Sequence, residues 1–265
     1  MFDLTDRVAM VSGSAQGMGR SMLLALAQHG ADCVVVDLNT ESAERTADEI
    51  RGLGRKAIVV QCDVSDVEQV RELYRRIDQD FGRIDFVGNV AGTSIRCRPE
   101  DIALEDVEAG WRSLVFGRFC SCQEAGRRML KQGRGSIVNI GSLASITALG
   151  RGHIAYSMAM GAVAQMTREL STEWSGRGVR VNCILPAQTL NPGLERRMAA
   201  DPRLKDRYMS GLAIGRFGDS DDIQGLAVFL ASDASSFITG ALLPMDGGNL
   251  AMNANGSVGT EVFKE

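Results

Sequence analysis

Short apolar runs alternate with longer segments of helical pattern along almost the whole chain, and this alternation restricts the possible folds more than any other feature. The runs lie at 7–11, 32–36, 56–61, 84–88, 135–140 and 179–185, with a last one that ends at 246. Solidly apolar strands are typical of parallel sheets that are buried on both faces. Strands that alternate with helices predict a doubly wound parallel α/β sheet of about seven strands, with helices on both faces.

The segments between these runs carry helical periodicity. They extend from a glycine-rich turn to about 29 and over about 41–53, 65–80, 104–131, 153–176, 195–208 and 220–231. A chain of 265 residues is long enough for one large α/β domain, and no repeat or linker divides it. We therefore expect a single domain over 1–265, with a variable lid at 188–215 and a polar tail at 249–265.

Charge and cysteine content exclude several classes of function. The formal net charge is −4 with acidic and basic residues interspersed, so no basic stripe offers a surface for nucleic acid. No apolar run approaches the length of a membrane span, and the first residues lack the basic and apolar parts of a leader segment. The six cysteines show no metal-ligand spacing, so we expect reduced thiols, no metal site and a cytoplasmic protein.

A glycine-rich turn joins the first run to the first helix. It reads Ser12-Gly13-Ser14-Ala15-Gln16-Gly17-Met18-Gly19, with the spacing Gly-x-x-x-Gly-x-Gly. Glycine lets the backbone approach a pyrophosphate, and the positive end of the helix dipole favours the charge of that group. Taken alone the turn is a weak indication, because glycine-rich turns are common.

An acidic residue, Asp37, ends the second run. A carboxylate at this place can hydrogen-bond the ribose hydroxyls of adenosine, and it repels a 2′-phosphate. No Arg or Lys directly precedes Gly17 or follows Asp37 to offset that repulsion. Together the turn, the helix and the acid favour a dinucleotide site that prefers NAD(H) to NADP(H), over the alternative of a turn without a ligand.

A serine follows the fifth run and a tyrosine opens the next helix. The serine stands in Gly141-Ser142-Leu143-Ala144-Ser145 and the tyrosine in Ala155-Tyr156-Ser157-Met158-Ala159-Met160, which places Met160 one helical turn beyond Tyr156 on the same face. With the glycine-rich turn, these residues resemble the short-chain dehydrogenase/reductase family, whose signature is a serine followed by Tyr-x-x-x-Lys. The resemblance covers about residues 5 to 248. It implies a Rossmann-type, NAD-dependent oxidoreductase that interconverts a secondary alcohol and a ketone, assembled as a homotetramer or homodimer.

The resemblance also assigns roles to individual residues. It makes Tyr156 the general acid/base and Ser142 the hydrogen-bond partner of the reacting oxygen. It implies cofactor contacts for Gly13, Ala15, Gln16, Gly17, Met18, Gly19, Asp37, Leu38, Asp63, Val64, Asn89, Ala91, Gly92, Tyr156, Pro186, Ala187 and Thr189. Asp63 has an alternative role as the cap of a helix that starts near Ser65. Ala187 replaces a glycine that is usual after Pro186, and because alanine takes positive φ only at a cost, we expect a reshaped loop there.

Two positions depart from the family pattern. Met160 stands in place of the lysine, and Leu114 stands in place of an asparagine that normally helps to hold a relay water for that lysine. The lysine cation lowers the pKa of the tyrosine and holds the nicotinamide ribose, whereas a methionine on a helix is by default a packing residue. We therefore expect impaired or restricted activity, with alcohol oxidation affected more than carbonyl reduction.

Three interpretations remain open. In the first, an active oxidoreductase uses Arg118, His153 or a lid residue in place of the lysine. Arg118 lies one turn beyond Leu114, although such an arginine is more often a surface or interface residue. In the second, the protein binds NAD without redox turnover, as a sensor, a scaffold or a partner subunit. In the third, it is an inactivated Lys-to-Met variant of an ordinary dehydrogenase. The substrate is not readable, because the lid arginines face solvent as readily as a ligand: Arg196, Arg197, Arg203 and Arg207.

Overall fold

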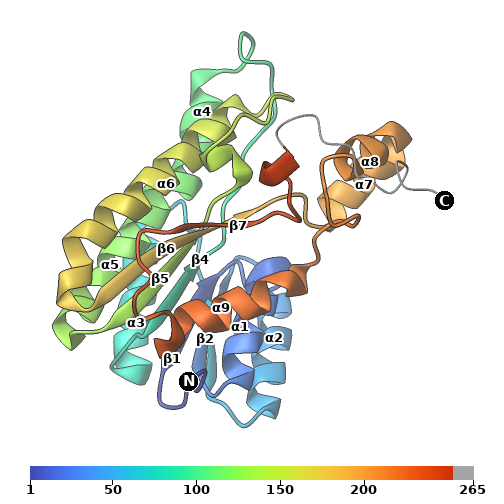
Figure 1. Cartoon of the computed structure of the whole chain (residues 1–265). Helices are drawn as coiled ribbons and strands as arrows, with labels where there is room; N and C mark the ends of the chain where they lie inside the picture. The colour runs from blue at the N-terminus through green and yellow to red at the C-terminus, as the bar shows by residue number, and fades with distance from the viewer. Residues whose placement is uncertain (253–265) are drawn as a thin grey trace.

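The computed structural model describes residues 1–252, and these contain one sheet of seven parallel strands (Figure 1). The strands are β1 Val8–Ser12, β2 Asp32–Asp37, β3 Ala57–Gln61, β4 Phe86–Asn89, β5 Gly135–Ile140, β6 Val179–Pro186 and β7 Leu242–Met245. Their order across the sheet is β3-β2-β1-β4-β5-β6-β7. The strand order reverses direction between β1 and β4, and ligands bind doubly wound sheets outside the carboxyl ends of the strands at such a point. The predicted fold class is confirmed.

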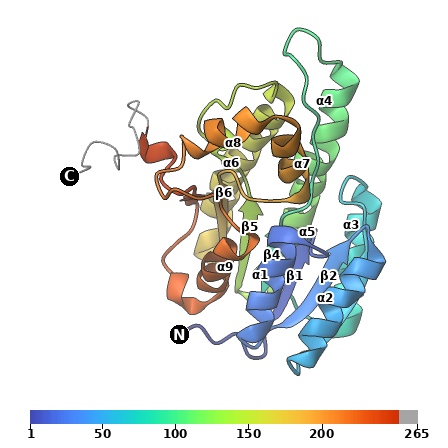
Figure 2. The ribbon, with the colours of Figure 1, turned by 90° about the vertical axis from the view of Figure 1, so that its right-hand side faces the viewer.

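Helices cover both faces of the sheet, as Figures 1 and 2 show. One face carries α1 Gly17–Gln28, α2 Thr40–Gly52 and α9 Gln224–Ala231. The other carries α3 Val67–Phe81, α4 Leu104–Trp111, α5 Arg118–Gln132 and α6 Ile154–Trp174. Two short helices, α7 Pro192–Ala200 and α8 Pro202–Met209, follow the carboxyl end of β6. Within residues 1–252 no helix combines the length and the apolar character that a membrane crossing needs.

Each strand contributes to two cores, because successive side chains of a strand point to opposite faces of the sheet. In β1, Ala9 and Val11 pack in one core with α1, α2 and α9, while Val8 and Met10 pack in the other with α3 and α5. Every residue of β1 is buried. This burial on both sides explains why the strand reads as a solid apolar run in the sequence.

The long helix predicted over 104–131 is interrupted. A π-helical segment, η1 Arg112–Gly117, separates α4 from α5. A single π turn adds one residue to a helix, which the apolar periodicity of one turn does not reveal. The end of η1 lies directly against the loop after β3, because a Cβ on Gly117 would stand 1.6 Å from the Val64 carbonyl oxygen. This close approach requires glycine at position 117.

The amphipathic helix predicted over 195–208 is two helices. Asp201 ends α7, and its carboxylate accepts a hydrogen bond from the Arg203 N–H at 3.1 Å as the cap of α8. Pro202, the first residue of α8, has no N–H and cannot continue the hydrogen-bond ladder of α7. The helix predicted over 220–231 likewise begins as a 3-10 turn, Ser220–Ile223, before α9. The predicted tail at 249–265 lies mostly outside the described residues.

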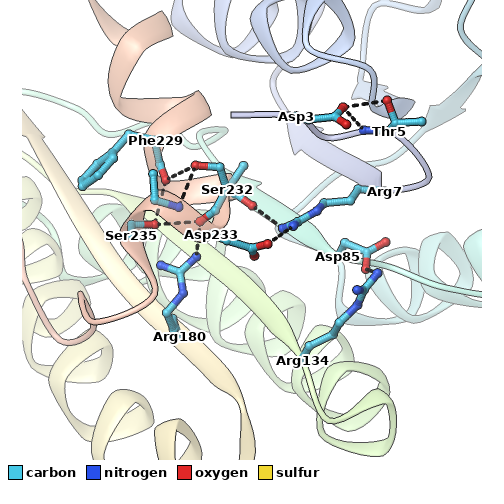
Figure 3. A network of polar contacts seen from close by, with 12 residues as sticks. Asp3, Thr5, Arg7, Asp85, Arg134, Arg180, Phe229, Ser232, Asp233 and Ser235 are labelled. Atoms are coloured by element: carbon cyan, nitrogen blue, oxygen red, sulfur yellow. Dashed lines mark hydrogen bonds and ion pairs between the residues drawn. The ribbon is translucent and has the colours of Figure 1, made fainter. Parts of the chain in front are cut away.

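Charged side chains gather at the amino ends of the strands (Figure 3). Asp85, directly before β4, accepts hydrogen bonds from the Val8 N–H at 2.9 Å and from Arg83 Nη2 at 2.6 Å. Arg7, directly before β1, forms an ion pair with Asp233 at 2.8 Å. These contacts join the starts of β1 and β4 to the segment after α9. They lie at the amino edge of the sheet, opposite the carboxyl edge where ligands bind in this fold.

Candidate active site

The residues singled out in the sequence lie at the carboxyl edge of the sheet. Parallel strands end on the same edge, and each candidate follows or closes one of them. Gly13 follows β1, Asp37 closes β2, Asp63 follows β3, Asn89 closes β4, Ser142 follows β5 and Pro186 closes β6. The structure thus places residues from six separate parts of the chain along the same edge of the sheet.

The turn between β1 and α1 leaves backbone N–H groups open. Helix α1 begins at Gly17, and the N-cap residue Gln16 makes no side-chain hydrogen bond to it. Gly13 has φ +72°, and a Cβ on Gly19 would stand 2.2 Å from the Gly13 carbonyl oxygen. Both observations require glycine. An open helix N-terminus with no acidic residue in its first turn fits the pyrophosphate of a dinucleotide.

The carboxylate of Asp37 is turned toward this glycine-rich turn. Its Oδ2 accepts a hydrogen bond from the Ala15 N–H at 3.1 Å, and its Oδ1 accepts one from the Asn39 N–H at 3.0 Å. Each carboxylate oxygen keeps a further lone pair for another donor. The neighbouring Leu38 side chain is exposed. This arrangement fits a carboxylate that receives ribose hydroxyls while two amides hold it in place.

Asp63 has a different local role from the cap that was predicted as its alternative. Its Oδ1 accepts hydrogen bonds from the Ser65 N–H at 2.8 Å and from the Ser65 hydroxyl at 2.7 Å. Helix α3, however, begins only at Val67, and Asp66 caps it by accepting the Glu68 N–H. The cap alternative for Asp63 is therefore wrong, since a second aspartate three residues later does that work. Asp63 instead closes a tight turn after β3.

Asn89 lies beneath the crevice, within the core. Its Nδ2 donates to Asn139 Oδ1 at 3.0 Å, and its Oδ1 accepts from the Ser121 hydroxyl at 2.7 Å. The next loop is held from below as well, because the Ala91 N–H donates to Ser12 Oγ at 3.2 Å. The side chain of Asn89 thus supports this loop through the core network.

A cavity of about 310 Å³ lies at the ends of β4, β5 and β6. Ser142 and Tyr156 both line it, together with the predicted cofactor residues Met18, Gly92, Pro186, Ala187 and Thr189. Its volume is at the small end of ligand sites, which suits a small substrate. The remaining predicted cofactor residues do not line this cavity. They lie at the carboxyl edge of the sheet, at the ends of β1 to β4 and at the start of α1: Gly13, Ala15, Gln16, Gly17, Gly19, Asp37, Leu38, Asp63, Val64, Asn89 and Ala91.

The hydroxyl groups of Ser142 and Tyr156 differ in their hydrogen bonding and in how easily they ionise. Ser142 Oγ accepts the Ala144 N–H at 3.2 Å, so its proton remains available to a ligand. Burial raises the pKa of Tyr156, while the Ser142 hydroxyl and the Arg118 charge act in the opposite direction. The His153 ring stands edge-on to Tyr156, with 5.9 Å between ring centroids. Burial lowers the pKa of His153, which favours a neutral imidazole beside the tyrosine.

The positions of the family's lysine and asparagine hold apolar packing. Met160 is 1 % exposed and belongs to the same buried cluster as Leu114 and Leu143. A Cβ on Gly92 would stand 2.5 Å from Leu114 Cδ2, so the Leu114 side chain lies over that glycine. The packing role predicted for Met160 agrees with this burial. Within residues 1–252 no lysine lines the cavity.

A buried cation, Arg118, lines the same cavity from α5. Its side chain is 3 % exposed; Nη1 donates to the Ile140 carbonyl at 2.6 Å and Nη2 to the Ala91 carbonyl at 3.2 Å. Burial lowers the pKa of Arg118, with Cys183 and Tyr156 acting against that shift. An arginine stays protonated at neutral pH even so. The more frequent surface role weighed for this residue is wrong.

Three further arginines line the cavity from separate segments: Arg96 after β4, Arg151 before α6 and Arg197 in α7. The Arg151 guanidinium lies 4.7 Å from the centre of the Tyr208 ring. Arg197 Nε donates to the Gly193 carbonyl at 3.1 Å, and its Nη1 is buried without a partner among the described residues. Sequence reasoning did not single out Arg151. The three arginines could have been found from the sequence, because each lies in a segment that follows or precedes an element at the carboxyl edge of the sheet.

The loop after β6 accommodates alanine without strain. Among residues 1–252 the non-glycine residues with positive φ are Asp6 and Arg151, so Ala187 takes an ordinary backbone conformation. Its N–H donates to the Met245 carbonyl at 3.1 Å. Thr189 pairs with Gly218 in an isolated β-bridge. Ala187 thus avoids the positive φ that the usual glycine could take, and the reshaping of this loop relative to the family stays a prediction.

Comparison with known proteins shows which family the chain belongs to. The family model described as enoyl-(acyl carrier protein) reductase matches residues 13–249. D-threitol dehydrogenase of Mycolicibacterium smegmatis is 39% identical over 247 residues, which cover 93% of this chain and 94% of that protein. Gluconate 5-dehydrogenase of Burkholderia cenocepacia, solved in complex with NADP and tartrate, superposes with a TM-score of 0.88 and 32% identity over 94% of this chain and 97% of that chain.

A second solved structure, NAD⁺-bound xylitol dehydrogenase, superposes with a TM-score of 0.88 and 28% identity over 92% of this chain and 99% of that chain. The match to the family model includes Gly13 to Gly19, Ser142 and Tyr156, and the relative and the two solved structures are each covered over nearly their full length. The chain therefore belongs to the short-chain dehydrogenase/reductase family, as its motifs predicted.

Proposed function

We propose that the protein is an NAD(H)-dependent oxidoreductase that interconverts a secondary alcohol and a ketone. The observation that carries this proposal is the presence of the Ser142 and Tyr156 side chains in one small cavity, next to Met18 of the glycine-rich turn and Pro186 at the end of β6. The open amides at the start of α1 and the Asp37 carboxylate support a dinucleotide along the same edge.

In alcohol oxidation, Tyr156 takes the hydroxyl proton of the substrate while the carbinol carbon gives up its hydrogen with two electrons. An oxidised nicotinamide held along the same edge would accept that hydride, so the products would be a ketone and the reduced cofactor. Ser142 donates a hydrogen bond to the reacting oxygen in either direction, in place of the hydrogen bond by which its hydroxyl acts on Tyr156. In reduction, the protonated Tyr156 returns the proton to the carbonyl oxygen.

The proposal includes a preference for NAD(H) over NADP(H). Asp37 would face a 2′-phosphate with like charge, and the residue that directly follows it is Leu38, not a cation. The solved relatives do not decide this question, because the gluconate 5-dehydrogenase holds NADP and the xylitol dehydrogenase holds NAD⁺. The support comes from the two amides that hold the Asp37 carboxylate at the end of β2.

We further propose that the substrate is an acid, in the sense of a hydroxy acid or a sugar acid. Arg96, Arg151 and Arg197 line the cavity, whereas no Asp or Glu of the described residues does so, although the whole chain carries a net charge of −4. Arginine binds carboxylates through paired N–H donors, and the buried Arg197 Nη1 has such a donor to spare. The related gluconate 5-dehydrogenase was solved with tartrate, a hydroxy acid.

A second candidate function is NAD binding without redox turnover, and the observation that favours it is the apolar packing around Met160.

For either function, we propose that the protein is a cytoplasmic homotetramer or homodimer. All six cysteines are free, which is usual for proteins of a reducing compartment.

One experiment separates the two functions. Gluconate and sorbitol differ chiefly in the carboxylate at one end, so they form a matched pair of acid and neutral polyol. We expect the purified chain to reduce NAD⁺ with the acid and not with the polyol, and Tyr156→Phe to lose that turnover. A protein that binds NAD(H) in calorimetry and turns over neither this pair nor other secondary alcohols, whether acids or neutral polyols, belongs to the second class. Turnover that survives in Tyr156→Phe contradicts the assigned site.

A further inference from the structure

Among residues 1–252, the Arg118 guanidinium is a buried cation without a carboxylate partner. It forms no ion pair among the described residues, and its two hydrogen bonds go to the Ile140 and Ala91 carbonyls at the ends of β5 and β4. Its Nε is buried and has no hydrogen-bond partner within residues 1–252. Burying an arginine in this way costs several kcal/mol, which carbonyl dipoles offset only in part.

The position of this cation matters because of what it faces. Arg118, Tyr156 and Met160 line one cavity, although Arg118 comes from α5 and the other two come from α6. The π-helical segment η1 directly precedes Arg118, and such segments are frequent at functional sites. The charge thus enters the site from a different helix than the family's lysine.

The interaction between Arg118 and Tyr156 is mutual. The Arg118 charge lowers the pKa of Tyr156 against the larger effect of burial, and Tyr156 in turn raises the pKa of Arg118 against burial. A buried cation gains most when an anion forms beside it in the same low-dielectric surroundings. The phenolate of Tyr156 is the one anion that the proposed reaction creates on the protein.

We propose that the Arg118 guanidinium supplies from α5 the positive charge that the missing lysine would supply from α6, and so stabilises the Tyr156 phenolate during alcohol oxidation. The inference rests on the function proposed above for Tyr156. In this interpretation, the positive charge has moved from position 160 on α6 to Arg118 on α5. Met160 and Leu114 then fill the positions of the family's lysine and asparagine with apolar packing.

Other groups around Tyr156 are less suited to this role. Burial lowers the pKa of His153 and raises that of Cys183 to about 11, so at neutral pH the first is favoured as neutral imidazole and the second as thiol. Arg96 and Arg151 are exposed and their charges are screened by water, and Arg197 sits at the lid. Arg118 alone among these cations is both buried and fixed by two hydrogen bonds.

The test compares a neutral and a cationic replacement that both keep an N–H donor for the two carbonyls. We expect Arg118→Gln to raise the pH at which Tyr156 ionises by about 1–3 pH units, the range found for one nearby charge. Alcohol oxidation at neutral pH should then fall by about tenfold to a thousandfold, with a smaller loss in carbonyl reduction. Arg118→Lys should remain within about tenfold of the parent protein, because the charge is kept.

Tyr156 ionisation is measured by ultraviolet tyrosinate absorbance. The titration of Tyr156→Phe, which keeps the other tyrosines, is subtracted from that of each protein to leave the signal of Tyr156. This titration needs no turnover, so it tests the inference even if the proposed substrate class is wrong. Arg127→Met is the matched control, since Arg127 is an exposed arginine of the same helix. It should leave both the titration and the rates unchanged.

A transplant of the charge completes the test. On the Arg118→Gln background, Met160→Lys should restore the lower ionisation pH and most of the oxidation rate, whereas Met160→Lys alone should change the parent rate by less than about threefold, because one cation is already present and a second is repelled. Equal Tyr156 titrations in the parent, Gln and Lys proteins would overturn the inference. A several-hundredfold gain from Met160→Lys alone would also overturn it, because Arg118 would then not be serving in place of lysine.

Discussion

The Asp37 carboxylate accepts a hydrogen bond from the Ala15 N–H at 3.1 Å, which ties the end of β2 to the glycine-rich turn after β1. The contact holds the acid beside the turn that is proposed to receive the pyrophosphate. It also keeps a negative charge where the 2′-position of an adenosine ribose would lie in this family. In the proposed cofactor site, this hydrogen bond would link the turn that receives the pyrophosphate to the carboxylate that selects NAD(H) over NADP(H).

This coupling predicts a change of cofactor preference. Asp37→Ser with Leu38→Arg removes the repelling charge and adds a cation at an exposed position. We expect NADP(H) affinity to rise and NAD(H) affinity to fall, with at least a tenfold change in their ratio, about 1.4 kcal/mol. Calorimetric titration of both dinucleotides measures it. Equal affinities for the two dinucleotides in the unmodified protein would remove Asp37 from its assigned role.

The contact between η1 and the loop after β3 predicts an unequal response of two helical glycines. A Cβ on Gly117 would stand 1.6 Å from the Val64 carbonyl oxygen, so Gly117→Ala should destabilise the fold by about 1–3 kcal/mol or more through overpacking. Gly161 in α6 has no atom within 4 Å of its added Cβ. Gly161→Ala should stabilise by about 0.5–1 kcal/mol in urea unfolding. A neutral effect at position 117 would mean that the helix moves freely away from Val64.

The sequence predicted the sheet because burial on both faces leaves a simple record in it. The segment 32–37 is apolar from Cys33 to Val36, and the segment 135–140 carries Ile137, Val138 and Ile140; the structure places both strands within one residue of the predicted ends. The helix interruption at η1 left no such record, since a single π turn preserves the apolar pattern of its neighbours. The break at Asp201 was readable from the Asp-Pro pair, which typically starts a new helix.

The site shows the same division. Ser142, Tyr156 and the glycine-rich turn could be predicted from the sequence. Each of these motifs lies within one continuous strand–turn–helix segment, so the spacing of its residues is visible in the sequence itself. The role of Arg118 depends on which way a helix turns and on which carbonyls lie opposite, namely those of Ile140 and Ala91. Contacts between distant segments of this kind are decided by tertiary packing, so composition and periodicity do not reveal them.

The arginines at the cavity predict how substrate affinity is distributed. Arg197→Met removes a buried donor that has no partner among the described residues. We expect the KM for a hydroxy acid to rise about tenfold or more with little change in kcat, since the carboxylate is held alike in ground and transition states. Arg196→Met, at an exposed position of the same helix, is the control and should leave KM unchanged. A loss confined to kcat would place Arg197 in the chemical step.

Apolar side chains on α5 and α6 predict an assembled protein. Phe119 and Met158 are exposed at 44% and 43%, and Phe116 in η1 is exposed as well. Burying such surface against a second copy would stabilise an oligomer. Light scattering at low micromolar concentration should give a dimer or a tetramer, and Phe119→Glu should lower the assembly state. A monomer in the unmodified protein would contradict the interface.

The ionisation of Tyr156 predicts the pH dependence of the reaction, and its sign follows from the direction of the pKa shift. Burial raises the pKa of Tyr156, and the Ser142 hydroxyl and the Arg118 charge recover part of that shift. A higher pKa means less phenolate at a given pH. Alcohol oxidation needs the phenolate and should therefore gain from alkaline conditions, whereas carbonyl reduction needs the protonated tyrosine.

We accordingly expect the oxidation rate to climb through the neutral range and on into the alkaline range, while the reduction rate stays flat there and falls only as Tyr156 ionises. Initial rates in both directions over a series of buffers at constant ionic strength measure this. Tyr156→Phe should abolish both rates, and Ser142→Ala should lower both by about a hundredfold or more, because each hydroxyl touches the reacting oxygen. His153→Gln should leave the shape of both profiles unchanged. An oxidation rate already level at neutral pH would show that Tyr156 is ionised there, and that the opposing charges outweigh its burial.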